Sequence, residues 1–342
     1  KPCLIYHPED AKVFAGLRMY PLPYSSRAEM ENQFTNYLYT FVRKMALNYS
    51  PHFEIPELDQ AGAGVVEWLR EKNFEVISSG SILSFFNTRW MMGHLDSHRA
   101  AASALDSVLR QSALWLGDRL AAGKKTTDLD LAREVERGLK KAGLESAAPV
   151  AVRLDSLTRS EDYFPDKKKK LEISRGSLIY LEVSARCRKA ELPMHARLGW
   201  TMVADTAALP AQAVEWQNIV KAADAALEYL NYRVPSKRTV QGFQVDDSAR
   251  ALLGAPDAMP RPLGVNLNPW GHSFGVCFDN WLTHDEREVM PGMGFTLEPG
   301  IWRAGYALRM CGNLFIASGE GDVRSVELSA PLQRKIIPLL AG

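Results

Sequence analysis

The spacing of apolar residues predicts helices and a strand in the first part of the chain. Residues 29–49 carry apolar side chains at helical spacing, which predicts one amphipathic helix. Its apolar stripe consists of Phe34, Tyr37, Leu38, Phe41, Val42 and Met45. A second helix with Val65, Val66 and Leu69 leads into a short strand that begins at Phe74. This pattern predicts a small α/β domain over residues 1–88.

A long helix opens the second part, and we place the domain boundary just before it, so that the second domain spans residues 89–342. This helix ends at Gly123, and the next one opens with Thr127 three residues before Asp130, an acidic variant of the capping box. The stripe of the long helix consists of Ala102, Leu105, Leu109 and Leu116. Further predicted elements are strands at 150–154, 177–183 and 197–205, helices at 210–230 and 245–253, and mostly strands after residue 254.

Composition narrows the classes of partner and compartment. Lys plus Arg number 41 and Asp plus Glu number 40, so no strong field favours nucleic acid or an anionic membrane. The first residues are charged too early for a signal peptide, and no run of 18 apolar residues occurs. Cys3, Cys187, Cys277 and Cys311 are scattered without a CxxC pair, which indicates neither a disulfide framework nor a zinc site. We therefore expect a soluble protein of the reducing cytoplasm.

Two short motifs in the last quarter of the chain carry a family resemblance. The stretch "PGMGFTLEPGIW" contains Glu298, and "GHSFG" contains His272. With the order of predicted elements, these motifs resemble the M24 peptidase family, which includes methionine aminopeptidases, Xaa-Pro aminopeptidases, prolidases and creatinase. The resemblance covers about residues 90–335. It implies an α+β protein with a C-terminal pita-bread domain after a small α/β N-terminal domain, and it implies a homodimer.

The resemblance also implies a set of metal ligands that this chain keeps only in part. In active relatives two Asp, one His and two Glu hold two divalent ions, because hard cations close together need several bridging oxygen donors. His272 and Glu298 match the ligand His and the first ligand Glu, whereas Cys311 occupies the place of the second Glu. The first Asp falls in "LIYLEVSARC", where Glu182 is the available acid, and the second falls near Pro193 or Met194.

This comparison predicts no dinuclear metal centre and no cofactor. If a metal is bound, the expected ion is Mn, Co, Fe or Zn, held by a shifted set. That set would be His272, Glu298, Glu182 and His195. Without a metal, we expect Arg309 to neutralise Glu298, since a carboxylate in an apolar strand needs a cation or donors.

The residues that would contact a ligand also differ from the family pattern. Asp166 lies in the loop where creatinase carries its acid/base His, and Asp279 falls at the place of a second family His. Trp270, close to His272 in the sequence, is a candidate aromatic wall for a ligand. Cys311 is predicted to be a small buried hydrophobic residue, and the alternative is a nucleophile. The catalytic candidates are His272 and Glu298. The substrate-binding candidates are Asp166, Trp270, Asp279, Arg309 and Cys311.

Two functions follow from the resemblance. The first is a degenerate M24 protein that binds a peptide or small amine without metal-dependent hydrolysis. Metal-free relatives such as creatinase and a histone-binding chaperone domain make such a role plausible for this fold. The second is an active hydrolase, either a metallo-aminopeptidase with a shifted ligand set or a creatinase-like metal-free C–N hydrolase. Neither a nucleic acid nor a membrane is expected as a partner.

Overall fold

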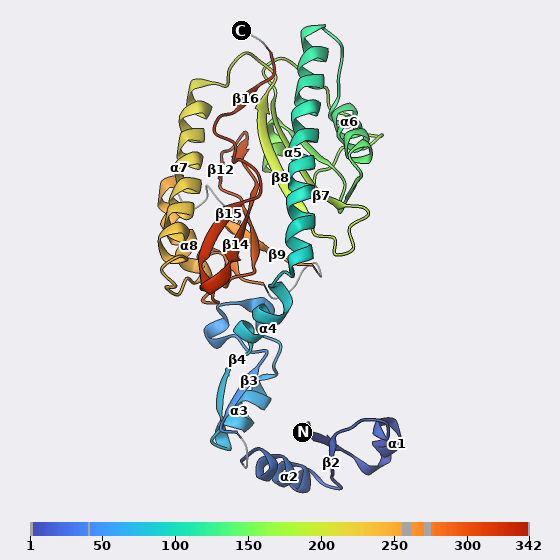
Figure 1. Cartoon of the computed structure of the whole chain (residues 1–342), viewed down its shortest axis with the longest axis vertical. Helices are drawn as coiled ribbons and strands as arrows, with labels where there is room; N and C mark the ends of the chain where they lie inside the picture. The colour runs from blue at the N-terminus through green and yellow to red at the C-terminus, as the bar shows by residue number, and fades with distance from the viewer. Residues whose placement is uncertain (1–2, 40–41, 255–260, 270–274, 341–342) are drawn as a thin grey trace. The chain divides into compact units, whose positions relative to one another are not determined.

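The computed structural model describes residues 3–39, 42–254, 261–269 and 275–340 (Figure 1). Backbone contacts divide the chain into two units, Lys1–Gly80 and Ser81–Gly342. The sequence placed the boundary at residue 88, and the units divide at residue 80. None of the helices in the described ranges is long and apolar enough to cross a bilayer.

The first unit contains two small parallel strand pairs with helices. Strands β1 (Cys3–Tyr6) and β2 (Tyr20–Pro23) form one pair, and β3 (Lys44–Leu47) and β4 (Glu75–Ser78) form the other. The helix predicted over 29–49 is too long, because Met45 pairs with Val76 across β3 and β4 and is therefore extended. The helices of this unit are α1 (Ala11–Phe14), α2 (Arg27–Tyr39) and α3 (Ala63–Glu71).

The first half of the second unit packs a sheet against two of its three helices. In that sheet β5, β6 and β8 pair with the long strand β7, and β16 pairs with β8. Alternate residues of β7 and β8 point to the helices and form one buried cluster with the stripe of α5. The elements are α4 (Gly80–Thr88), α5 (Met92–Ala121), α6 (Asp128–Lys141), β5 (Leu144–Ser146), β6 (Ala151–Leu154), β7 (Leu178–Cys187), β8 (Ala196–Val203) and β16 (Ile337–Pro338).

Local signals in the sequence set the ends of α5 and α6 as predicted. Thr127 Oγ1 accepts a hydrogen bond from the Asp130 N–H at 3.2 Å, and Asp130 Oδ2 accepts one from the Thr127 N–H at 3.0 Å. This is the reciprocal capping box expected from the sequence. Gly123 and Gly143, which follow the two helices, have positive φ angles of 64° and 72°. Glycine adopts this left-handed conformation at no steric cost, so each helix stops there.

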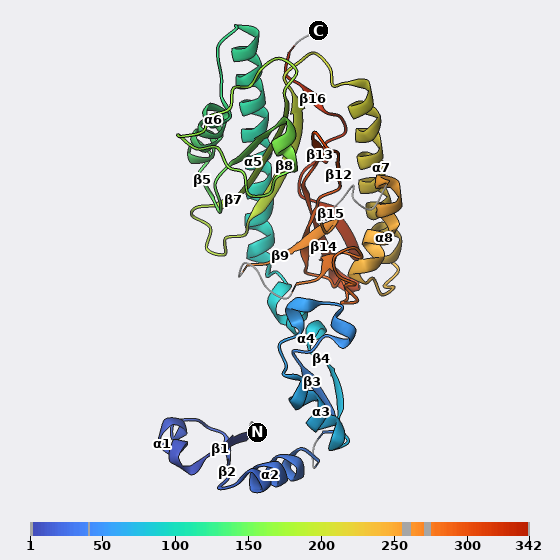
Figure 2. The ribbon, with the colours of Figure 1, turned by 180° about the vertical axis from the view of Figure 1, so that it is seen from behind.

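The second half of the unit packs two helices against a second sheet of order β10-β9-β11-β14-β15. Trp216, Phe295 and Leu314 are among the buried residues that join these helices to this sheet. The helices α7 and α8 lie on one side of the unit and α5 and α6 on the other, with the strands between them (Figures 1 and 2). The elements are α7 (Pro210–Arg233), α8 (Gly242–Leu253), β9 (Gly264–Leu267), β10 (Cys277–Phe278), β11 (Gly294–Leu297), β12 (Gly300–Trp302), β13 (Ala307–Arg309), β14 (Gly312–Ser318) and β15 (Arg324–Leu328).

The two halves meet where β8 passes Cys311, between β13 and β14. The Gly199 N–H donates to the Cys311 carbonyl at 2.9 Å, and the Cys311 N–H donates to the Gly199 carbonyl at 3.0 Å. A Cβ atom at Gly199 would lie 2.3 Å from Tyr180 Oη, so glycine is required for this close approach. The junction brings the inner faces of both halves together.

Candidate functional site

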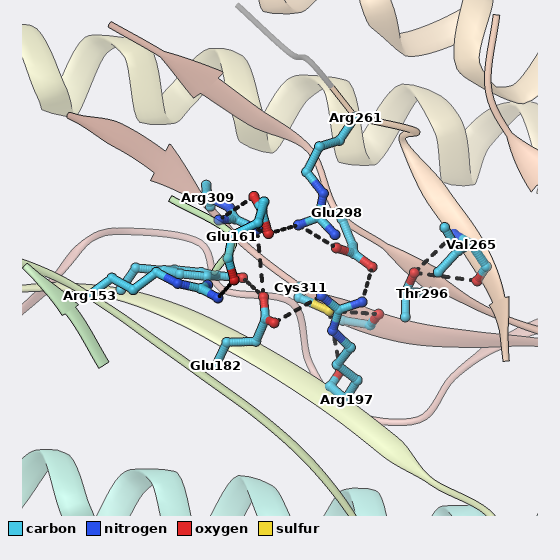
Figure 3. Close-up of polar contacts among 12 residues, drawn as sticks. Arg153, Glu161, Glu182, Arg197, Arg261, Val265, Thr296, Glu298, Arg309 and Cys311 are labelled. Carbon is cyan, nitrogen blue, oxygen red and sulfur yellow. Dashed lines mark hydrogen bonds and ion pairs between the residues drawn. The ribbon is translucent and has the colours of Figure 1, made fainter. Parts of the chain in front are cut away.

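The candidate site is a cluster of charged side chains that lies on the inner face of β6, β7 and β8, opposite the helices (Figure 3). Glu182 pairs with Gly199 and Ser184 pairs with Arg197 in the strand register, so Glu182 and Arg197 are diagonal neighbours on this face. Segments beside β9 and β11, strand β13 and the loop after residue 159 supply the other members. We call this cluster the arginine–glutamate network; it consists of Arg153, Glu161, Glu182, Arg197, Arg261, Glu298 and Arg309.

At its centre Arg197 bridges two glutamates. Its Nη2 lies 2.9 Å from Glu182 Oε1, and its Nη1 lies 3.1 Å from Glu298 Oε1. The Tyr180 hydroxyl donates a further hydrogen bond of 2.7 Å to Glu182 Oε2. Only 6% of the Glu298 side chain is exposed, so its charge is matched almost entirely by protein groups. One guanidinium fork therefore binds both carboxylates, and Arg261 and Arg309 supply further positive charge to Glu298 and Glu182 respectively.

The charges of this centre shift the pKa values of its members. Burial raises the pKa of Glu182, but the ion pairs with Arg197 and Arg309 outweigh burial and bring it to about 2. Burial lowers the pKa of Arg197, and the charges of Glu298 and Glu182 more than compensate and hold it well above its ordinary value. Both partners are therefore ionised over the whole range in which the protein would work.

We expect Glu182 to make the protein less stable in acid. Its pKa is about 2 in the folded state against an ordinary value of 4.5, so between these values the unfolded chain binds a proton that the folded chain does not. The free energy of unfolding should fall as pH drops from about 5 towards 2, by on the order of 2–3 kcal/mol from this residue. Urea unfolding between pH 6 and pH 3 measures the slope.

The matched variants for this slope are Glu182→Gln and Glu145→Gln. Glu182→Gln should flatten the dependence on pH, whatever its own stability, because the titrating group is gone. Glu145 makes a half-exposed pair with Arg186 on the same sheet, so its replacement should leave the slope nearly unchanged. Equal slopes for wild type and Glu182→Gln would contradict the prediction.

Glu161 binds two further arginines at the outer side of the network. Arg309 approaches it with both Nη atoms, at 2.9 and 3.2 Å, and Arg261 Nη1 lies 3.0 Å from Glu161 Oε2. Arg261 also lies 3.5 Å from Glu298 Oε2. The expected pair of Arg309 with Glu298 is therefore wrong. The Arg309 guanidinium carbon lies over the Tyr180 ring, 4.5 Å from its centroid, and Arg309 pairs with Glu161 and Glu182 instead.

Cys311 is buried at the junction of the two halves. Its Sγ lies 3.4 Å from the Arg197 carbonyl oxygen, to which the thiol donates. Burial raises the pKa of this thiol well above its ordinary value, and the nearby charge of Glu298 adds to the effect. The thiol is therefore protonated at neutral pH, which argues against the nucleophile alternative.

The structure does not bring His195 to the network. Its carbonyl accepts a hydrogen bond of 2.7 Å from His98, and the charged groups that act on its ring are Arg186 and Glu145. Met194, near which the second metal Asp was expected, packs in a small apolar cluster with Trp90. Arg197 is instead the β8 residue that faces Glu182. His272 and Trp270 lie outside the described residues.

Asp166 and Asp279 bind the backbone of their own loops. Asp166 is exposed, and its Oδ1 accepts from the N–H groups of Lys168 and of Lys169, the latter at 3.0 Å. Asp279 is buried and accepts four hydrogen bonds, which come from the Trp281, Leu282 and Thr283 N–H groups and the Thr283 hydroxyl at 2.9–3.1 Å. Both carboxylates therefore stabilise the backbone of the loops in which they lie.

Sequence reasoning missed four members of the network. They are Arg153, Glu161, Arg197 and Arg261. A signal was present for two of them, because Arg153 and Arg197 stand within otherwise apolar strand sequences, where a charge requires a buried partner. Glu161 and Arg261 lie in loops, and their spacing along the chain gives no sign that they meet.

Comparisons with known proteins agree with this architecture. The model of metallopeptidase family M24 matches residues 96–326. An X-Pro aminopeptidase from Thermotoga maritima MSB8 is similar in structure, with 14% identity, coverage of 98% of this chain and 87% of that one, and a TM-score of 0.62. A prolidase from Pyrococcus furiosus has 13% identity, coverage of 97% and 88%, and a TM-score of 0.58. No curated protein matches the sequence.

A third similar structure is the N-terminal domain of the FACT complex subunit SPT16 from Cicer arietinum (chickpea). It has 15% identity, coverage of 93% of this chain and 80% of that one, and a TM-score of 0.58. At these identities the likeness concerns the fold. The prediction of an α+β protein with the pita-bread fold is confirmed.

Proposed function

Because the chain belongs to metallopeptidase family M24, we propose that it binds a peptide or small amine on the family scaffold without a pair of catalytic metal ions. The observation that carries this proposal is the position of Arg197. Its guanidinium lies between Glu182 and Glu298, the residues that correspond to metal ligands by the family resemblance. A fixed cation of the protein thus lies between carboxylates that, by the family resemblance, would face metal ions in active relatives.

The donor set of the network supports the same proposal. A divalent ion between Glu182 and Glu298 would meet the positive charge of Arg197 at close range, and Cys311 offers a protonated thiol where a carboxylate is expected. Within the described ranges, no group of three or more His, Cys, Asp and Glu side chains is arranged to hold a metal. The described residues of the network therefore do not fit a dinuclear centre, and we derive no metal-dependent step.

A structural relative that is not named as a peptidase adds support. The SPT16 domain is described as part of a FACT complex subunit, and it shares this fold over most of both chains. The same scaffold therefore occurs in a protein named for its complex and not for a peptidase activity.

The decisive experiment is the metal content per chain. Protein purified without chelator would be dialysed against manganese or cobalt, then against metal-free buffer, and analysed for both elements. We expect well below one ion per chain, because Arg197 already supplies the positive charge. The same protocol applied to an active M24 aminopeptidase gives the positive control. About two ions per chain, with manganese-dependent cleavage of an Xaa-Pro peptide, would overturn the proposal.

A further inference from the structure

We propose that the outer half of the network, formed by Arg153, Arg261 and Arg309, is a binding site for the carboxylate of a peptide-like ligand. In the free protein, the Glu161 side chain takes the place of that carboxylate. This inference rests on the proposed function and adds to it a ligand class and a competitor within the chain. Figure 3 shows the Glu161 carboxylate beside Arg309 and Arg261.

The first argument is an excess of buried donors. Arg153 is 2% exposed, and its Nη2 donates to the Glu161 carbonyl oxygen at 2.7 Å. Its Nε and Nη1 make no hydrogen bond to any described residue, although both are buried. Leaving a buried donor without a partner is destabilising, and more so when the group is charged. An incoming anion with free acceptor oxygens would satisfy donors that Glu161 leaves unused.

The second argument is the imperfect fit of Glu161. Glu161 Oε1 lies within ion-pair distance of Arg309, and Glu161 Oε2 within ion-pair distance of Arg261 Nη1. Even so, Glu161 Oε1 and Arg261 Nη1 have no well-directed hydrogen bond among the described residues. The Glu161 side chain is also 39% exposed and lies in a loop, so it can turn into water while the arginines stay. A contact with these properties is easily exchanged.

The third argument is the charge balance. Four arginines face three glutamates in the network, which leaves one net positive charge with Glu161 in place and two with Glu161 in solvent. Arg309 is buried and presents its planar fork to the Glu161 carboxylate. This fork geometry matches any other carboxylate as well. A neutral amide or a cation would not compete with Glu161.

The test compares two probes that differ only at their C-terminus. Acetyl-Ala-Ala with a free carboxylate and acetyl-Ala-Ala-amide would be titrated into the full chain by isothermal calorimetry. We expect the acid to bind at least about tenfold more tightly than the amide. Glu161→Gln should tighten binding of the acid by about tenfold, since it removes a competitor that blocks the site most of the time. Glu145→Gln changes a half-exposed glutamate outside the network and should leave both affinities unchanged.

Three results would overturn the inference. The first is equal binding of acid and amide, and the second is no binding of the acid even to Glu161→Gln. The third is weaker binding of the acid to Glu161→Gln than to wild type, which would mean that Glu161 contacts the ligand as a partner. Arg309→Lys keeps the charge but loses the fork, and it should weaken binding of the acid at unchanged far-UV circular dichroism. The metal measurement decides the proposed function separately, because absence of both metal and acid binding refutes this inference alone.

Discussion

Replacing Arg197 by methionine is expected to lower the free energy of unfolding by about 3–5 kcal/mol. The variant removes the cation between Glu182 and Glu298 but keeps an unbranched apolar side chain in place of the arginine stem. Two buried carboxylates then face each other with less compensation, and an uncompensated buried charge is among the most destabilising features in a protein. Urea unfolding at pH 7 measures the change.

Two control variants define what Arg197 contributes. Arg186→Met removes a half-exposed ion pair with Glu145 that joins β7 to β5 in the same sheet, and it should cost less than about 1 kcal/mol. The triple variant Arg197→Met, Glu182→Gln, Glu298→Gln should recover part of the lost stability, since both carboxylates that Arg197 contacts are then replaced by neutral amides. A single Arg197→Met variant as stable as wild type would show that the glutamates do not depend on this cation.

Replacing Asp279 by alanine is expected to cost about 2–4 kcal/mol. Its carboxylate accepts four hydrogen bonds within residues 279–283 and is buried, so the variant leaves three backbone donors of that loop without their acceptor. Urea unfolding gives the total loss. Hydrogen exchange of the Trp281, Leu282 and Thr283 amides should show faster exchange confined to this loop.

Asp166→Ala provides the matched comparison. Sequence reasoning assigned both aspartates to the ligand, and both bind the N–H groups of their own loops. Asp166 is exposed, so water can replace its carboxylate and the cost should remain near about 0.5 kcal/mol. Equal losses for the two variants would contradict the loop role derived for Asp279.

The sequence by itself determined the local elements and the family. Some features depend only on neighbours within a few residues, so the sequence alone predicts them. They are the apolar stripe of α5, the capping box at Thr127 and the glycines that follow α5 and α6. The motif around Glu298 likewise lies in a single stretch and identifies the fold. The helix predicted over 29–49 is wrong at its C-terminal end. There Met45 pairs with Val76, a residue distant in sequence, and this pairing makes the backbone at Met45 extended.

Only the tertiary structure decided how the charges of the site pair. Arg197 binds Glu182 and Glu298 because the register of β7 and β8 and the junction at Gly199 bring three distant segments together. Glu161 reaches Arg309 from a loop that carries no motif. Which charged side chains pair depends on which segments the fold brings together. The composition sets only how many ion pairs are possible. The sequence therefore predicted that the family's metal ligands are incomplete, whereas the fold shows which cation lies between Glu182 and Glu298.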